Sequence, residues 1–259
     1  MLARRSREAR VAEGWVAYLL LFASGVVAGA LNVLAGGGSF LTLPVLILLG
    51  LPATAANGTN RIGVITQNVG AVWAFRRHGV LQARWTLRYA LLPSVAGSVL
   101  GTWAALEIPD AAFRKLLAVL MLVVTVWTLW DPIRPPTSDR PREGSTALAV
   151  GFFVAGVYGG FVQAGVGFIL LALTSLAGFD LVRGNGIKVL CILVFTVLSV
   201  ALFAWRGELR WGVGLLLAVG TTIGGLIGAH LTVLKGHRWL RGVVTVAVVV
   251  LAVRLWWTA

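Results

Sequence analysis

Residues 29–50 read GALNVLAGGGSFLTLPVLILLG, which places three consecutive glycines inside an otherwise apolar stretch. Glycine weakens a helix because it loses more conformational freedom on folding than any other residue. In lipid every backbone N–H and C=O must find a partner, so such a break is tolerated only where it faces protein, water or a ligand. The stretch therefore predicts a broken helix buried inside a membrane protein, with the shorter piece over residues 39–50.

The composition of the whole chain agrees with lipid burial. Of 259 residues, 58% are hydrophobic and only 12% are charged, about half the charged fraction of soluble domains. This excludes a soluble enzyme, a disordered chain and a disulfide scaffold, and the lone Cys191 allows no internal disulfide. The net charge of +13 comes from basic clusters between apolar runs, a pattern typical of positive-inside topology. We therefore expect a lipid bilayer as partner and no nucleic acid.

The apolar runs occur twice in the same order: one long run, a glycine-rich break, one short run and three long runs. The first half comprises residues 15–35, 39–50, 54–75, 85–106 and 112–130, and the second comprises 146–162, 166–177, 181–205, 211–234 and 239–257. A spanning helix needs about 20 residues, so each short run, with 12 residues, reaches only halfway. A proline-rich and charged linker over residues 131–145 separates the halves.

A shift of 127 positions superposes the halves, placing Gly38 on Gly165 and Arg61 on Lys188. We predict an all-α integral membrane protein with two pseudo-symmetric repeats, 1–130 and 146–259, each a glycine-broken helix hairpin plus three transmembrane helices. Because the first run belongs to this internal repeat, we expect it to be a span rather than a signal peptide. The turn charges favour inverted repeats, although these place the basic N-terminus outside. Parallel repeats with four crossings each remain the alternative.

The two breaks are the candidate site. A helix that starts after a break points unpaired N–H groups and a partial positive charge toward it, which attracts anions. The segment after each short run adds uncharged donors and one cation. We predict that substrate is bound by Gly36, Gly37, Gly38, Ser39, Asn57, Thr59, Asn60, Arg61, Gln67, Gln163, Gly165, Asn185 and Lys188. Other spaced glycines, Gly97 with Gly101 and Gly224 with Gly228, fit close helix packing.

Acidic residues are absent from the middle of every run. All nine lie in terminal, linker or turn positions: Glu8, Glu13, Glu107, Asp110, Asp131, Asp139, Glu143, Asp180 and Glu208. Cation carriers and proton relays usually hold a carboxylate within the membrane, so the remaining donors and cations suit an anion. The sequence also offers no metal-ligand spacing, hydrolytic triad or phosphate-binding loop. We expect no cofactor and no enzymatic activity.

Two segments around the first break, GGGSFLTLP at residues 36–44 and LPATAANGTN at 51–60, resemble the TauE/SafE family of membrane proteins. The Arg76-Arg77-His78-Gly79 turn is similar as well, and the likeness extends more loosely through the second repeat. The resemblance implies movement of small anions, notably sulfite and organosulfonates, usually outward. Gly58-Thr59-Asn60 stands where the family has Gly-Thr-Ser, and Gly184-Asn185-Gly186 takes that place in the second half.

Together these features predict a secondary transporter in the cell (inner or plasma) membrane that exports a small anion by alternating access. Its expected partners are the anion and the bilayer, and a homodimer is left open. Two rival functions remain: a gated anion channel, and a membrane subunit that scaffolds a partner without transport. The residues do not specify which anion is carried.

Overall fold

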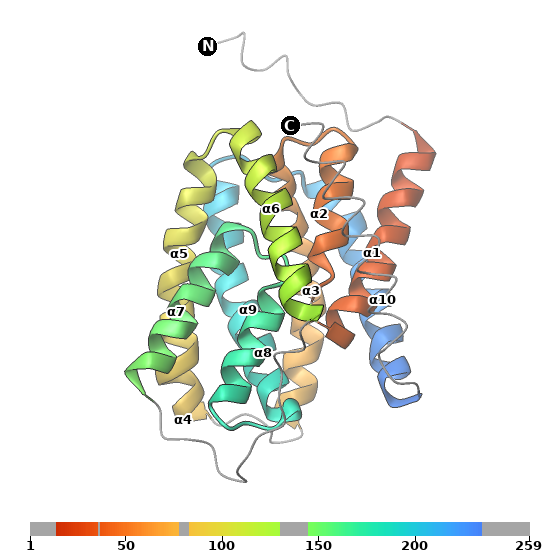
Figure 1. The fold of residues 1–259 in the computed structure, drawn as a ribbon. Helices are drawn as coiled ribbons and strands as arrows, with labels where there is room; N and C mark the ends of the chain where they lie inside the picture. Colours follow the sequence, from red (N-terminus) through yellow and green to blue (C-terminus); the bar gives the residue numbers. More distant parts are fainter. Residues whose placement is uncertain (1–13, 36, 78–82, 130–144, 235–259) are drawn as a thin grey trace.

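The computed structural model describes residues 14–35, 37–77, 83–129 and 145–234, and these contain helices and no strand, as expected. The helices stand side by side as one bundle (Figure 1). In chain order they are α1 Trp15–Ala35, α2 Ser39–Leu48, α3 Ala53–Arg77, α4 Ala83–Trp85, the π-helical turn η1 Thr86–Leu91, α5 Leu92–Glu107, α6 Asp110–Leu129, α7 Thr146–Phe161, α8 Val166–Leu176, α9 Leu181–Trp205 and α10 Trp211–Leu234. The predicted run 239–257 and nearly all of the linker lie outside the described residues.

The bundle has the surface of a protein embedded in lipid. Within the described residues, three stretches are long and apolar enough to cross a membrane: Trp15–Asn32, Thr86–Glu107 and Val182–Trp205. Large apolar side chains remain exposed, including Trp15 at 74% and Trp205 at 82%. Apolar surface on this scale is stable only when lipid or another protein covers it. Tryptophans at helix ends also suit the interface between hydrocarbon and headgroups.

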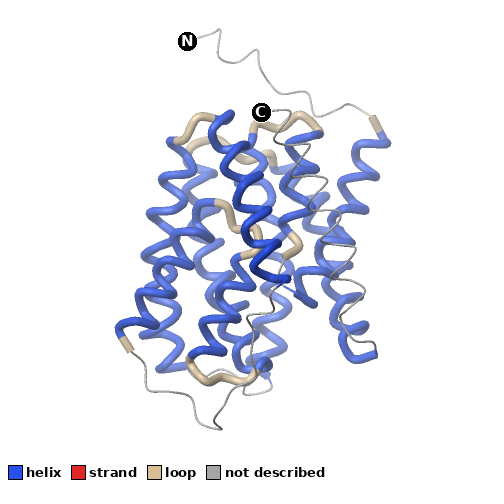
Figure 2. The backbone as a smooth tube through the Cα atoms, in the orientation of Figure 1, coloured by secondary structure: helices blue, strands red, loops and turns tan. Residues whose placement is uncertain are grey.

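Both predicted helix breaks are present. Helix α2 has 10 residues and α8 has 11, so at a rise of about 1.5 Å per residue each is about half as long as the hydrocarbon core is thick. The loop segments that precede them lie at mid-height of the bundle (Figure 2). Each short helix therefore begins inside the bundle and returns toward the end from which its hairpin entered.

Helices α3 and α9 run in opposite directions. At the end of the bundle where α3 begins, the Ala53 N–H donates to Asp110 at the start of α6. Arg206, which follows α9, pairs there with Glu107 at the end of α5. Thus α3 begins where α9 ends. Figure 1 shows the same reversal for the first helix of each half, since α1 descends from the N-terminal side and α7 ascends toward it.

Facing glycines bring two helix pairs into backbone contact, α5 with α7 and α1 with α10. A Cβ on Gly97 would lie 2.1 Å from the carbonyl oxygen of Phe153, and one on Gly224 would lie 1.9 Å from that of Val26. Equally close approaches occur at Gly29, Gly101, Gly156 and Gly160. The packing role predicted for Gly97, Gly101 and Gly224 is confirmed. The surroundings of Gly228 are outside what the structure describes.

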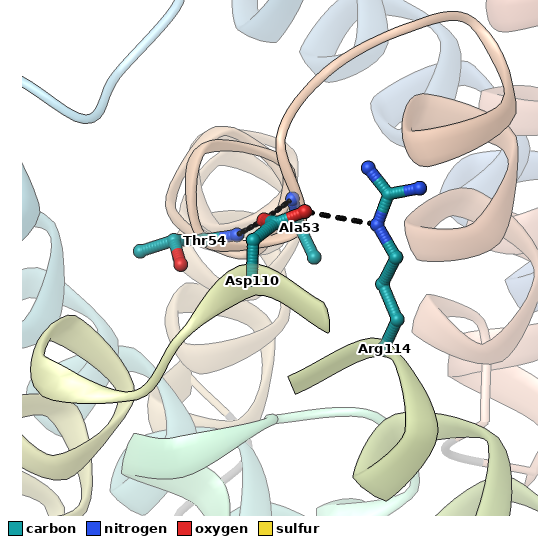
Figure 3. Close-up of polar contacts among 4 residues, drawn as sticks. All are labelled: Ala53, Thr54, Asp110 and Arg114. Carbon is teal, nitrogen blue, oxygen red and sulfur yellow. Dashed lines mark hydrogen bonds and ion pairs between the residues drawn. The ribbon is translucent and has the colours of Figure 1, made fainter. Parts of the chain in front are cut away.

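The start of α3 is capped from another helix rather than from its own sequence. Proline precedes Ala53 and has no side-chain oxygen to offer, so the first N–H groups of α3 need an outside acceptor. Asp110 supplies it: its Oδ1 accepts from the backbone N–H groups of Ala53 and Thr54 (Figure 3). Its Oδ2 accepts from Nε of Arg114 at 2.9 Å. The carboxylate thereby fixes the polar helix α3 to α6.

Asp110→Ala should destabilise the protein by about 0.5–2 kcal/mol, the usual cost of losing a helix cap. Asp110→Asn keeps an oxygen for the two N–H groups and loses only a partly exposed ion pair, so its effect should be smaller. Thermal unfolding of the purified variants in detergent measures both. Equal stability of Asp110→Ala and the parent would show that the cap contributes nothing.

Candidate functional site

The polar face of α3 points into the bundle. This helix has 25 residues, yet no stretch of it qualifies as an apolar span. Asn57, Asn60 and Arg61 are fully or almost fully buried, with 0%, 2% and 0% of their surfaces exposed. Residues three and four apart share one face of a helix, so these three side chains project together from α3. They contact both helix breaks.

Asn60 contacts the first break. Its Nδ2 donates to the Ser39 hydroxyl at 3.0 Å, and its Oδ1 accepts from the Thr42 hydroxyl at 2.6 Å. Ser39 and Thr42 belong to the first turn of α2, where unpaired backbone donors are expected. Two of those donors, the N–H groups of Phe40 and Leu41, bond to the carbonyls of Gly37 and Gly38 at 3.0 Å. The α2 terminus therefore offers fewer open N–H groups than an uncapped helix end.

Arg61 and Asn57 contact the second break. Nη2 of Arg61 donates to the Gly160 carbonyl at 2.6 Å, and Nδ2 of Asn57 donates to the Phe161 carbonyl at 2.7 Å. These carbonyls end α7, where helix geometry leaves acceptors unpaired and a partial negative charge. The hydroxyl of Thr102 donates to the same Gly160 oxygen at 3.2 Å. A helix of the first half thus caps the broken helix of the second half.

The turn between α7 and α8 holds its shape through Gln163. This residue has a φ of 65°, and Gly165 has a φ of 75°. The left-handed region is easy for glycine but costs other residues about 1–2 kcal/mol. Nε2 of Gln163 donates to the Thr196 hydroxyl of α9 at 2.8 Å, and the Tyr158 hydroxyl donates to the Ala164 carbonyl at 2.5 Å. Hydrogen bonds on both sides of the turn therefore stabilise the strained backbone of Gln163.

Several polar groups around the second break remain uncommitted. Nε and Nη1 of Arg61 and Oε1 of Gln163 are buried and have no hydrogen-bond partner. The guanidinium carbon of Arg61 lies 5.2 Å from the centroid of the Phe203 ring, so one of its neighbours is an aromatic side chain. In the described part of the chain, carboxylates pair with arginine only at helix ends, at Glu107, Asp110 and Asp180. Arg61 is a buried cation to which no described carboxylate is paired.

The two breaks lie next to each other. A Cβ on Gly37 would come within 2.9 Å of the Phe168 ring in α8, so the first break contacts the short helix of the other half. A Cβ on Gly38 would lie 2.1 Å from the Ala28 carbonyl of α1. Gly38 is thus required for close packing against backbone, whereas the Phe168 side chain next to Gly37 can shift.

Some predicted residues lie away from this cluster. The Thr59 hydroxyl accepts from the backbone N–H of Arg210 at 3.1 Å, toward the start of α10. Gln67 bonds to α1, donating to the Gly29 carbonyl at 3.0 Å and accepting from Asn32 at 3.1 Å. Lys188 is buried in the half of α9 that lies away from Phe203, and Asn185 stands one turn before it on α9. Gly36 lies outside the described residues.

Four hydroxyl residues around the breaks were not predicted. Thr42 and Thr196 bond to Asn60 and Gln163, and the hydroxyls of Thr102 and Ser199 share a hydrogen bond of 2.7 Å. Each is a small polar residue within an otherwise apolar run. Their polarity was the available signal, but such residues often bond only to the backbone of their own helix, as the Ser98 hydroxyl does with the Val95 carbonyl. Only the three-dimensional fold separates the two cases.

No group of three or more His, Cys, Asp and Glu side chains that could hold a metal ion is found among the described residues. The site instead offers amide, hydroxyl and guanidinium groups. The N–H and O–H groups of these side chains donate hydrogen bonds, and only the carboxamide and hydroxyl oxygens accept them. The guanidinium carries the positive charge of the site. Such a set suits a small anion that accepts hydrogen bonds.

Gln163→Gly tests the role of the strained turn. Glycine removes the backbone strain while the variant loses one hydrogen bond, and these effects nearly cancel, so the unfolding temperature should change little. If the site holds a small anion, the loss of one amide contact should weaken its binding about tenfold, which corresponds to about 1.4 kcal/mol. Gln163→Asn, which tolerates the same backbone, is the matched control. Unchanged anion binding by Gln163→Gly would exclude a contact between this side chain and an anion.

These features define a helical membrane protein whose interrupted helices meet around buried polar groups. The family model described as "Sulfite exporter TauE/SafE" matches residues 21–255. The chain belongs to this family, whose members are membrane transporters rather than enzymes. The resemblance noted in the sequence is thereby confirmed.

Curated relatives carry general names. The chain is 31% identical over 231 residues to a "Probable membrane transporter protein" of Haemophilus influenzae, covering 88% of this chain and 89% of that protein. It is 26% identical over 237 residues to "Probable membrane transporter protein ORF9" of a Sinorhizobium species, covering 91% and 90%. It is also 26% identical over 240 residues to "Probable membrane transporter protein YfcA" of Escherichia coli, covering 91% and 88%. No solved structure matches the chain.

Proposed function

We propose that the protein exports a small oxyanion, sulfite or an organosulfonate, across the cell (inner or plasma) membrane, with Arg61 as the main anion-binding residue. The observation that carries the proposal is the environment of the Arg61 side chain. This side chain is fully buried, it has no carboxylate partner among the described residues, and two of its nitrogens have no hydrogen-bond partner. A buried cation of this kind is costly unless something negative joins it. A transported anion fulfils that requirement.

The anion would bind between the two breaks. Asn57, Asn60 and Gln163 supply neutral hydrogen-bonding groups around Arg61, and the hydroxyls of Ser39 and Thr42 line the first break. Oxyanions such as sulfite and sulfonates present several acceptor oxygens, which match multiple donors. Because the Gly160 carbonyl already occupies Nη2 of Arg61, the anion would use Nε and Nη1.

Alternating access would follow from inverted repeats, 1–130 and 146–259. The opposite courses of α1 and α7, and of α3 and α9, support this arrangement. In such folds broken helices meet near the bilayer midplane and one group of helices rocks against the other. The hairpins α1–α2 and α7–α8 would move against the other helices, each together with the helix to which facing glycines pack it, α10 for the first hairpin and α5 for the second. The Arg61–Gly160 bond links a helix of one half to the hairpin of the other half. Anion binding at Arg61 would therefore change a contact that this hairpin makes.

Export needs no coupling ion in this scheme. A negative cell interior favours exit of an anion by about 2.3 kcal/mol per charge for each 100 mV. The described carboxylates, at Glu107, Asp110, Asp180 and Glu208, lie at or beyond helix ends, where they are poorly placed to carry a coupling cation. The membrane potential would therefore drive the flux.

Reconstitution tests the proposal. The full chain is placed in liposomes loaded with sulfite, and sulfite release is followed under an imposed membrane potential. We expect saturable, strongly temperature-dependent release that accelerates when the interior is negative. Unitary currents in planar bilayers would instead identify a gated channel. Release no faster than from empty liposomes, for sulfite and for taurine alike, would favour a non-transporting scaffold and overturn the proposal.

A further inference from the structure

Each half of the protein buries its own cation. Arg61 lies eight residues after the start of α3, and Lys188 lies seven residues after the start of α9. They are 0% and 3% exposed. Among the described residues, neither belongs to an ion pair, and every ion pair found there lies at a helix end. Both positions therefore carry a positive charge for which the described chain supplies no countercharge.

The two cations are far apart. Phe203 of α9 packs against the Arg61 guanidinium, with 5.2 Å from the guanidinium carbon to the ring centroid. Lys188 stands 15 residues earlier on the same helix as Phe203, so the backbones of these two residues are about 22 Å apart along the helix axis. The antiparallel courses of α3 and α9 explain the separation. Arg61 and Lys188 lie at similar distances from the starts of their helices, but these two helices start at opposite ends of the bundle. One sulfite-sized anion cannot contact both charges.

Other polar groups lie toward the end of the bundle where α9 begins. Asn185, one turn earlier on α9, has a buried Oδ1 without a partner. The turn η1 packs against α9, and at its start Thr86 and Trp85 bury an Oγ1 and an Nε1 that also lack partners. The Trp85 ring contacts Phe179, just before α9 begins, at 4.6 Å between centroids. Uncommitted polar groups thus gather at the end of the bundle where α9 begins.

The backbone is also irregular at this end. Residues 86–91 form a π-helical turn, whereas α10, the counterpart in the second half, is described as one α-helix over Trp211–Leu234. Such π-turns occur frequently at functional sites. The irregularity, the buried lysine and the three unpartnered polar atoms are independent observations on the same end of the bundle.

We propose that Lys188 is the anchor of a second anion-binding station, with Asn185 beside it, separate from the Arg61 station. This rests on the proposed function, because both stations would bind the transported anion. The anion passes from one station to the other during transport, and the two stations lie at different depths in the bundle. Two anions bind per chain when both stations are filled.

Equilibrium dialysis of the purified full chain in detergent against radiolabelled sulfite counts the stations. We expect two sulfite ions per chain in the parent protein, one in Lys188→Met, one in Arg61→Leu and none in the double variant. Lys115→Met, at an exposed lysine of α6, is the matched control and should bind two. Lys188→Gln provides a second test of the same site, and unfolding temperatures identify any variant that does not fold.

The possible failures are distinguishable. A parent protein that binds one sulfite, lost in both Arg61→Leu and Lys188→Met, has a single shared site, which overturns the second station but leaves anion transport intact. Two sulfite ions bound by folded Lys188→Met and Lys188→Gln would also overturn it. A parent protein that binds no sulfite and no taurine would instead refute the proposed function itself.

Discussion

Arg61→Leu should lose sulfite transport almost completely, by about a hundredfold or more, while the protein remains folded. Each hydrogen bond to a charged group contributes roughly 1.5–3 kcal/mol, and about 1.4 kcal/mol corresponds to a factor of ten. Arg61 has two nitrogens free for the anion, so losing both contacts gives a change of this size. Release of sulfite from proteoliposomes, over a range of concentrations, measures it.

Stability should respond in the opposite sense. The variant removes a buried charge that has no carboxylate partner among the described residues, and with it the desolvation cost of that charge. We therefore expect an unfolding temperature equal to or above that of the parent in the absence of anion. Arg206→Leu removes an arginine from a partly exposed ion pair with Glu107 and is the matched control, which should transport normally. Normal sulfite release by Arg61→Leu would remove this side chain from the site.

Gly97→Leu should prevent folding. A Cβ at this position would lie 2.1 Å from a backbone oxygen of α7, and backbone cannot rotate away as a side chain can. The two helices would have to separate along their whole contact, because Gly101, Gly156 and Gly160 share the same close approach. We expect a destabilisation above about 4 kcal/mol, at the extreme of single substitutions. The yield of monodisperse protein in size-exclusion chromatography measures the effect.

Gly70→Leu is the control for a change of the same size. Nothing lies within 4 Å of a Cβ at Gly70, which stands in α3, so this variant should be recovered in normal amounts. Gly224→Leu should behave like Gly97→Leu, since it occupies the equivalent contact between α10 and α1, where a Cβ would lie 1.9 Å from the Val26 oxygen. Normal recovery of Gly97→Leu would mean that the α5–α7 contact is looser than described.

The sequence predicts the breaks well because their signal is local. Three glycines in an apolar run, followed by a run too short to span, are visible without tertiary information, and α2 and α8 begin at the expected Ser39 and Val166. The spaced glycines likewise indicate close packing. The polar character of α3 is also readable, since Asn57, Asn60 and Arg61 share one face.

Long-range contacts are what the sequence does not specify. Nothing local shows that Arg61 bonds to the carbonyl of Gly160, which lies 99 residues away. Nor does the repeat pattern reveal that Lys188 lies far from Arg61, because that depends on the direction of each helix. The expected continuous run over 85–106 contains a π-turn, which ends just before Pro93. Proline has no N–H and its ring clashes with a preceding carbonyl, so the helix changes its bonding there.

The most direct test of an anion bound at Arg61 is the unfolding temperature of the purified protein with and without sulfite. A ligand that binds only the folded state stabilises it by about 2.7 kcal/mol at a hundred times its Kd. We predict a clear rise in the unfolding temperature of the parent and of Arg206→Leu, and a distinctly smaller rise in Arg61→Leu. The absence of any rise in the parent with sulfite or taurine, or equal rises in the parent and Arg61→Leu, would contradict it.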